Sequence, residues 1–424
     1  GVVNLTAGAN ANIAGGSILA QAGNVHITAT KNVEQSNGSI NVGAGSIEID
    51  AGDSVTQSNG SMLAAEGTIS INATNNIKLY DGQMQAKQAT LVATNGYIDQ
   101  NYNNDSTSFN GYALKVTDKL IVAAGNKGNN ATAINLGSRF NELQNIVLKA
   151  SKGDILIGSG RSTAGDLSIA VATNEVVDGN VEFHNYANGT ANKIFLKDSL
   201  KATGDIKIIN DESIPNSEAT GIIDTISIQV GNNLPSVSVE AGKNIVLQAN
   251  AGSIMNTGSM KAQDISLRAE QGSVLNGQNA DMLTTNGSIE MYALNAIGNA
   301  GELQAEQGHI SLHAVNGVLY NDANATMLSK GGNIELLSDK NNVTNRSGAN
   351  LVSVGGTVTL HAGEGNVENA GDLVALGGQI VLQSDKGNVT NSDNFNTMYS
   401  NGAQNDKFDG KDITTGSITM SAKH

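Results

Sequence analysis

A short phrase of the form Gly-x-Ile/Val-x-Ile/Leu-x-Ala recurs along most of the chain, and it constrains the fold more than any other feature. Near the start it occupies residues 23–29, 45–51 and 67–73, so successive phrases begin about 22 residues apart. Self-similarity at a period of about 20 to 24 residues indicates a solenoid, in which each repeat forms one coil. In the C-terminal half the first apolar residue of the phrase is Ile245, Ile265, Ile289, Ile310, Ile334, Val358, Ile380 and, after an insertion, Ile418.

Each phrase is expected to be a half-buried β-strand, because apolar and polar residues alternate strictly and β-branched residues dominate. Two weaker elements complete the coil: one ends in Asn or Gln, as at 55–57 and 254–256, and the other ends in Ala, as at 62–64 and 260–262. Each strand would then pair with the same strand in the coils above and below. The sequence therefore predicts an all-β fold, a right-handed parallel β-helix of about 17 to 18 three-strand coils.

The composition agrees with such a stack. Aromatic residues make up only 3% of the 424 residues and Trp is absent, so the core must consist of Ile, Val, Leu and Ala. The absence of Cys excludes disulfides and thiolate metal sites. A net charge of −15 without a basic stripe makes nucleic acid an unexpected partner. No apolar run reaches the roughly 18 residues of a membrane helix, so we expect no membrane insertion of this segment.

The period becomes irregular in the middle of the chain, which suggests three regions. We expect regular coils over residues 1–100, irregular coils with loop insertions over 101–240, and regular coils over 241–424 with an insertion near 391–412. Insertions in repeat proteins lie on the surface and commonly carry specific contacts.

Aromatic residues gather around 101–115 and 178–192, which are therefore the candidate contact loops. An exposed Tyr offers an apolar face and a hydroxyl, which suits recognition of a sugar or a protein. The alternative is that the rings form small clusters that seat the loops on the coils. The candidate ligand-binding residues are Tyr97, Tyr102, Phe109, Tyr112, Phe183 and Tyr186.

Asparagine recurs at the coil spacing, and a structural ladder is expected from it. Stacked amides can bond to one another along a column, as in cross-β structure. The alternative is that each amide bonds to its own turn. The earlier coils place Gln35, Gln57 and Gln100 at the same position. The ladder residues are Asn256, Asn276, Asn299, Asn321, Asn345, Asn369 and Asn391.

The chain shows no pattern that predicts a catalytic or metal site, and we expect no cofactor. His309 and His313 would span about 13 Å on a strand and could not share an ion. Carboxylates such as Glu290 and Glu335 fall in different coils, where solvated surface charge is the favoured interpretation. A polysaccharide lyase or glycosidase, which needs clustered carboxylates on one outer face, is the less favoured alternative.

The coil pattern, clearest over 244–262 and 356–375, resembles the filamentous-haemagglutinin type of repeat. That family comprises large adhesins and related exoproteins of Gram-negative bacteria, exported by two-partner secretion or as autotransporter passengers. The resemblance implies an extracellular or cell-surface location, an outer-membrane transporter as export partner, and roles in adhesion, biofilm formation and virulence. The family's Asn-Pro-Asn-Gly secretion motif is missing, so we expect a segment of a longer protein.

Fold and resemblance together predict an adhesin or structural shaft that displays loops to a host-cell, bacterial or glycan receptor. Self-association into a surface layer or fibre is the alternative. No enzymatic activity is expected.

Overall fold

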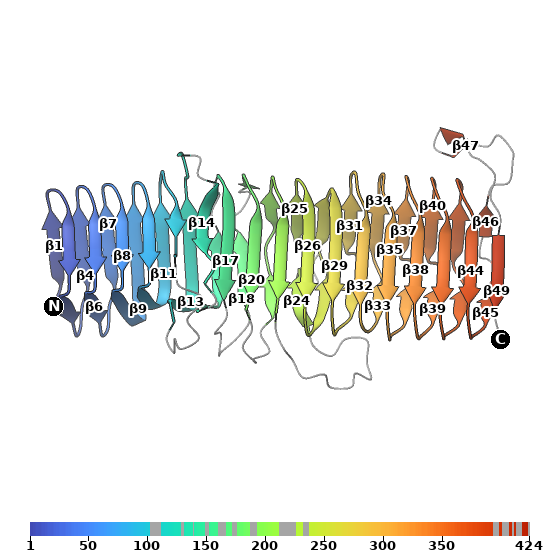
Figure 1. Cartoon of the computed structure of the whole chain (residues 1–424), viewed down its shortest axis with the longest axis horizontal. Helices are drawn as coiled ribbons and strands as arrows, with labels where there is room; N and C mark the ends of the chain where they lie inside the picture. The colour runs from blue at the N-terminus through green and yellow to red at the C-terminus, as the bar shows by residue number, and fades with distance from the viewer. Residues whose placement is uncertain are drawn as a thin grey trace. The chain divides into compact units, whose positions relative to one another are not determined.

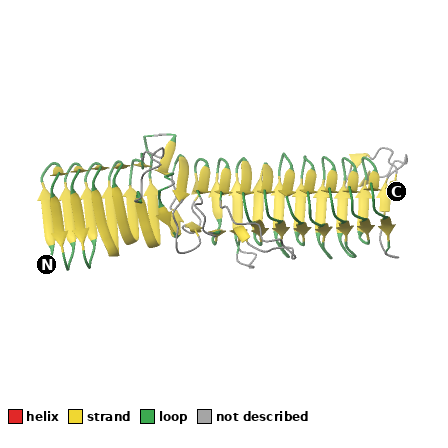
Figure 2. Ribbon diagram, turned by 60° about the horizontal axis from the view of Figure 1, so that its bottom comes forward, coloured by secondary structure: helices red, strands yellow, loops and turns green. Residues whose placement is uncertain are grey.

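The chain is a β-solenoid of about 15 turns built from stacked parallel sheets, which confirms the predicted fold class (Figure 1). The turns are fewer than the 17 to 18 coils expected, because several turns contain more residues than the 20 to 24 of the regular repeat. The computed structural model describes residues 1–424 except 102–111, 129–130, 139, 149–151, 160–166, 172–175, 187–192, 212–225, 232–236, 393–397, 401–406, 409–410, 413–417 and 423–424. Within the described part, every regular element is a strand, and loops join the strands into successive coils (Figure 2).

Contacts divide the chain into two units. Unit 1 comprises residues 1–205 with 209–213, and unit 2 comprises residues 206–208 with 214–424. In both units a coil runs from a strand that carries the phrase, to a strand that carries the Asn or Gln position, to a third short strand. We call the surfaces made by these strands the phrase face, the amide face and the third face.

In unit 1 the strands of each face pair in parallel with those of the neighbouring coils. The phrase face consists of β1 (Val3–Ala7), β4 (Val25–Ala29), β7 (Ile47–Ala51), β9 (Ser61–Ala73), β11 (Gln83–Ala93), β13 (Leu114–Ala124), β16 (Asn145–Leu148), β18 (Leu167–Val171) and β21 (Ile194–Leu196). The amide face consists of β2 (Ala11–Ala14), β5 (Val33–Ser36), β8 (Val55–Ser58), β10 (Ile77–Tyr80), β12 (Ile98–Asp99), β14 (Thr132–Leu136), β17 (Asp154–Ser159) and β20 (Val181–Asn185). The third face consists of β3 (Ser17–Ala20), β6 (Ser39–Val42), the first residues of β9, β11 and β13, and β15 (Glu142–Leu143).

Among the described residues of unit 1, β15 is the last strand of the third face. Further along the unit, β19 (Val176–Val177) pairs with β22 (Leu200–Ala202). β19 lies between a phrase strand, β18, and an amide strand, β20, and it belongs to a different sheet from β15. β23 (Ile206–Asn210) contains residues of both units.

Unit 2 repeats the same three strands in regular register. The phrase face consists of β26 (Asn244–Ala249), β29 (Asp264–Ala269), β32 (Ile289–Ala293), β35 (Ile310–Ala314), β38 (Ile334–Ser338), β41 (Val358–Ala362), β44 (Ile380–Ser384) and β49 (Ile418–Ala422). The amide face consists of β24 (Ile226–Val230), β27 (Ser253–Asn256), β30 (Val274–Asn276), β33 (Ile297–Asn299), β36 (Leu319–Asn321), β39 (Val343–Asn345), β42 (Val367–Asn369) and β45 (Val389–Asn391). The third face consists of β25 (Ser238–Ala241), β28 (Ser259–Ala262), β31 (Asp281–Thr284), β34 (Glu302–Ala305), β37 (Thr326–Ser329), β40 (Asn350–Ser353), β43 (Asp372–Ala375) and β46 (Met398–Ser400), and a separate antiparallel pair is formed by β47 (Lys407–Phe408) and β48 (Lys411–Asp412).

The core of each unit lies inside the coils. In unit 1, Ile47 pairs in register with Ile69, and both side chains are fully buried, as the alternation predicts. In unit 2, Ile310 and Ile334 occupy the equivalent stacked positions and are also fully buried. Burying one such side chain stabilises the fold by about 1.5 to 3 kcal/mol. Stability is therefore spread over many small aliphatic contacts between adjacent coils.

Candidate binding surfaces

Seven asparagines form a continuous column at the end of the amide strands of unit 2. Each side-chain amide nitrogen donates a hydrogen bond to the side-chain carbonyl oxygen of the next Asn, over distances of 2.7 to 3.0 Å. The first six side chains are fully buried, and Asn391 at the end is exposed. The members are Asn256, Asn276, Asn299, Asn321, Asn345, Asn369 and Asn391.

The glutamines at this position in unit 1 bond differently. Gln35 Nε2 donates to the Ser61 carbonyl at 2.8 Å, and Gln57 Nε2 donates to the Gln83 carbonyl at 3.1 Å. The longer glutamine side chain reaches the backbone of the following coil, so these residues join coils without bonding to each other. Gln100 instead exchanges two amide hydrogen bonds of 2.9 Å with Asn141.

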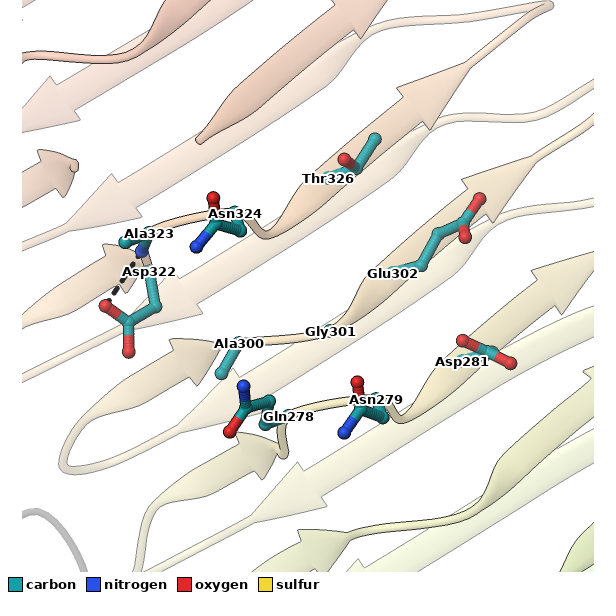
Figure 3. Close-up of a pocket in the computed structure, with 10 residues that line it drawn as sticks. All are labelled: Gln278, Asn279, Asp281, Ala300, Gly301, Glu302, Asp322, Ala323, Asn324 and Thr326. Carbon is teal, nitrogen blue, oxygen red and sulfur yellow. Dashed lines mark hydrogen bonds between the residues drawn. The ribbon is translucent and has the colours of Figure 1, made fainter. Parts of the chain in front are cut away.

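A pocket of unit 2 arises from unequal turns after the asparagine column. The turns after Asn276 and Asn321 occupy residues 277–280 and 322–325, whereas the intervening turn consists only of Ala300 and Gly301. The short turn is recessed between its longer neighbours and leaves a pocket of about 410 Å³, which we call the notch (Figure 3). Its lining is Gln278, Asn279, Asp281, Ala300, Gly301, Glu302, Asp322, Ala323, Asn324 and Thr326.

Hydrogen-bond acceptors dominate the chemistry of the notch. Asp281 and Glu302 occupy paired positions on adjacent third strands. Asp322 accepts hydrogen bonds from the Arg346 guanidinium at 2.8 Å and from the Ala323 amide at 2.9 Å. Burial acts to raise the pKa of Asp322, but these bonds outweigh it and hold that pKa below its ordinary value. The notch can thus accept hydrogen bonds from hydroxyl or ammonium groups.

Left-handed backbone conformations shape both this notch and a similar groove in unit 1. Asn279 and Asn324 have φ values of 62° and 64°. In unit 1, Asn37 and Asn59 have φ values of 53° and 51° and line a groove of about 380 Å³. Asn tolerates this conformation better than other residues with a side chain, because its amide bonds locally to the backbone. Stacked turns of one shape therefore produce grooves at the coil corners.

Two of the predicted aromatic residues lie against lysines on different faces of unit 1. The Tyr97 ring centroid is 5.9 Å from Lys78 Nζ. The Tyr112 ring centroid is 5.8 Å from Lys115 Nζ, and its hydroxyl donates a hydrogen bond to Gln85. Burial raises the pKa of Tyr112. Both rings are half-buried, which agrees with seating on the coils as much as with contact to a ligand.

The assignment of Phe183 as a ligand-binding residue is wrong. Its side chain is fully buried in β20, where it points into the core. Neighbouring Tyr186 is half-buried and stacks on His184, with ring centroids 3.7 Å apart. His184 Nε2 in turn lies 2.6 Å from Asp211 Oδ2. Tyr102 and Phe109 lie outside the described residues.

In the described ranges, no group of three or more His, Asp or Glu side chains is placed to hold a metal ion. The same part of the chain contains no helix with the length and apolar character needed to cross a bilayer.

The chain matches no family model, and it shows no significant similarity to a curated protein or to a solved structure. The class that the geometry defines is a parallel β-solenoid, which is compatible with a filamentous-haemagglutinin type of repeat.

Proposed function

We propose that this chain is the structural shaft of an adhesin that Gram-negative bacteria secrete or display at the cell surface. The observation that carries the proposal is the regular register of unit 2, in which the apolar core and the asparagine column continue from coil to coil. A scaffold of this kind grows by adding coils, and each coil is stabilised mainly by its neighbours. Such a scaffold suits a protein that must carry binding groups away from a surface.

The partners follow from the same proposal. Export would need an outer-membrane transporter, and contact would involve a host-cell or bacterial receptor, with glycans as one class. A chain without Cys needs no oxidant to fold. Coils that depend only on their neighbours can form in succession as a chain emerges from a transporter. Both properties support an exported location.

An attachment assay tests the adhesin function. Beads coated with the purified chain should attach to epithelial cells or to Gram-negative bacteria several-fold more than beads coated with an unrelated protein of similar charge. Free folded chain should compete with this attachment, and heat-denatured chain should not. Equal attachment of both bead types, on all cells tried, would contradict the adhesin function.

The notch favours a second candidate, a polysaccharide-acting hydrolase. Glycosidases use a pair of carboxyl groups that flank the scissile bond, and Asp281 and Glu302 are paired carboxylates at a pocket. Incubation with a panel of polysaccharides, followed by measurement of new reducing ends, distinguishes the two functions. A hydrolase would release reducing ends and lose this activity in Glu302→Gln, whereas a shaft would release none.

A further inference from the structure

One column of outward-facing side chains on the phrase face of unit 2 consists largely of planar groups. Strand pairing places one residue per coil at the same register position, so neighbouring members lie one coil apart, about 4.8 Å. We call this set the planar column. Its members are Gln248, Arg268, Tyr292, His313, Leu337, His361 and Gln383.

The central members contact one another directly. The Arg268 guanidinium carbon lies 4.1 Å from the Tyr292 ring centroid, which is a cation–π contact. The Tyr292 and His313 rings meet edge to face, with centroids 5.6 Å apart and an interplanar angle of 84°. The exposed fractions of the Arg268, His313 and His361 side chains are 47%, 35% and 29%. These groups are thus held in place by their neighbours and still accessible to a ligand.

Carboxylates flank the column, and three of them already face a donor of this chain. Glu270 accepts hydrogen bonds from the Arg268 guanidinium. Asp339 lies 3.1 Å from His313 Nε2, and Asp385 lies 3.1 Å from His361 Nε2. A carboxylate has about four acceptor positions, so Glu270 and Asp339 can accept further hydrogen bonds from a hydroxyl.

Charge and hydrogen bonding narrow the class of ligand. Together with Glu290 and Glu335 on the same face, the flanking acids outnumber the single Arg, so a polyanion would be repelled. Glu270, Asp339 and Asp385 already face a donor of this chain, so a cationic peptide would gain less charge pairing from them than from solvated carboxylates. An uncharged molecule with many hydroxyls requires no charge pairing, because its apolar C–H groups can contact the exposed parts of the planar groups and its hydroxyls can donate hydrogen bonds to Glu270 and Asp339.

We propose that the planar column binds an uncharged oligosaccharide laid along the stacking direction of the coils, with Tyr292 and His313 at the centre of the contact. The inference deepens the proposed function, on which it rests, by naming the binding face and the ligand class. Leu337 interrupts the planar groups between His313 and His361. A planar residue at that position should therefore extend the contact.

Calorimetric titration of the whole chain with defined hexasaccharides tests the proposal. Maltohexaose, cellohexaose and laminarihexaose serve as uncharged probes, and a heparin hexasaccharide and a lysine-rich peptide serve as charged ones. At least one uncharged probe should bind, and Tyr292→Ala should weaken its affinity by about tenfold or more. The matched control is Tyr399→Ala, which removes an exposed Tyr from the third face of the same unit and should leave the affinity unchanged.

Leu337→Tyr separates a binding role from a structural one. If the column binds sugar, this variant should raise the affinity several-fold, an effect that a purely structural column would not produce. Binding of only the heparin fragment or the peptide, or equal losses in Tyr292→Ala and Tyr399→Ala, would overturn the proposal. If coated beads attach to cells but Tyr292→Ala attaches as well as the original chain, the binding face is refuted while the adhesin function stands; if no beads attach, the function itself fails.

Discussion

Replacing Asn321 by Ala tests whether the asparagine column stabilises unit 2. The Asn321 side chain accepts a hydrogen bond from Asn299 at 2.8 Å and donates one to Asn345 at 3.0 Å, and it is fully buried. Each lost bond costs about 1 kcal/mol, and an acceptor left buried without a donor costs about 1 to 3 kcal/mol more. Asn299 keeps a second acceptor, the Gly301 carbonyl, so the unsatisfied group is the Asn345 carbonyl oxygen. We expect a total loss of about 3 to 5 kcal/mol in the free energy of unfolding.

Urea titration followed by far-UV circular dichroism measures this loss. Asn391→Ala is the matched control, because it removes the exposed end of the same column, where water can replace the lost bond. The control should cost less than about 1 kcal/mol. Because solenoids can unfold in parts, amide hydrogen exchange in β36 and β39 should accelerate more than in the strands of unit 1. Equal destabilisation by the two substitutions would show that the column adds no stability through its buried bonds.

Three further substitutions probe other features of the fold. Phe183→Ala should cost about 3 to 5 kcal/mol in a urea titration, because it empties a fully buried position; a loss below about 1 kcal/mol would place the ring outside the core. Asn279→Val should destabilise the chain by about 1 to 2 kcal/mol in a thermal melt, since a β-branched residue resists φ of 62°, while Asn279→Gly should be nearly neutral. Arg346→Ala should raise the pKa of Asp322 in an NMR titration. A carboxyl group with a depressed pKa in the folded state stabilises the fold above its unfolded pKa, and this stabilisation is lost as the pH falls through the folded pKa. The variant should therefore lose less stability than the original chain on acidification below about pH 4. An unchanged Asp322 titration would refute the pairing of Asp322 with Arg346.

The fold could be predicted because two periods coincide in the sequence. Alternation within each phrase indicates which residues face inward, and the coil period indicates which of them stack, so the burial of Ile47 and Ile69 follows directly. The asparagine spacing indicates a column, but it does not decide whether each amide bonds to the next Asn or to its own turn, because spacing does not say where an amide points. Asn299 in fact bonds both to Asn321 and to the Gly301 carbonyl of its own turn.

Other features needed coordinates or a closer reading of the sequence. Phe183 falls within residues 178–192, which the aromatic content marks as a loop, although the alternation of Val181, Phe183 and Asn185 is that of an amide strand and indicates an inward ring. The notch was not predicted, yet its signal is the short interval between Asn299 and Glu302 compared with the neighbouring coils. The extra strand β19 has no such signal, because it is only two residues long and β18 before it carries the ordinary phrase.

The unequal turns after the asparagine column show where this scaffold tolerates change. The turn at Ala300 and Gly301 is two residues shorter than the turns on either side, which changes the shape of the surface. The strands next to it nevertheless keep their partners in the adjacent coils. Chain length and strand register are thus decoupled at this corner. A foreign peptide epitope grafted in place of residues 277–280 should therefore be presented on the outside while the interior of the unit stays as it is, which makes this corner a natural site for variation and for engineering.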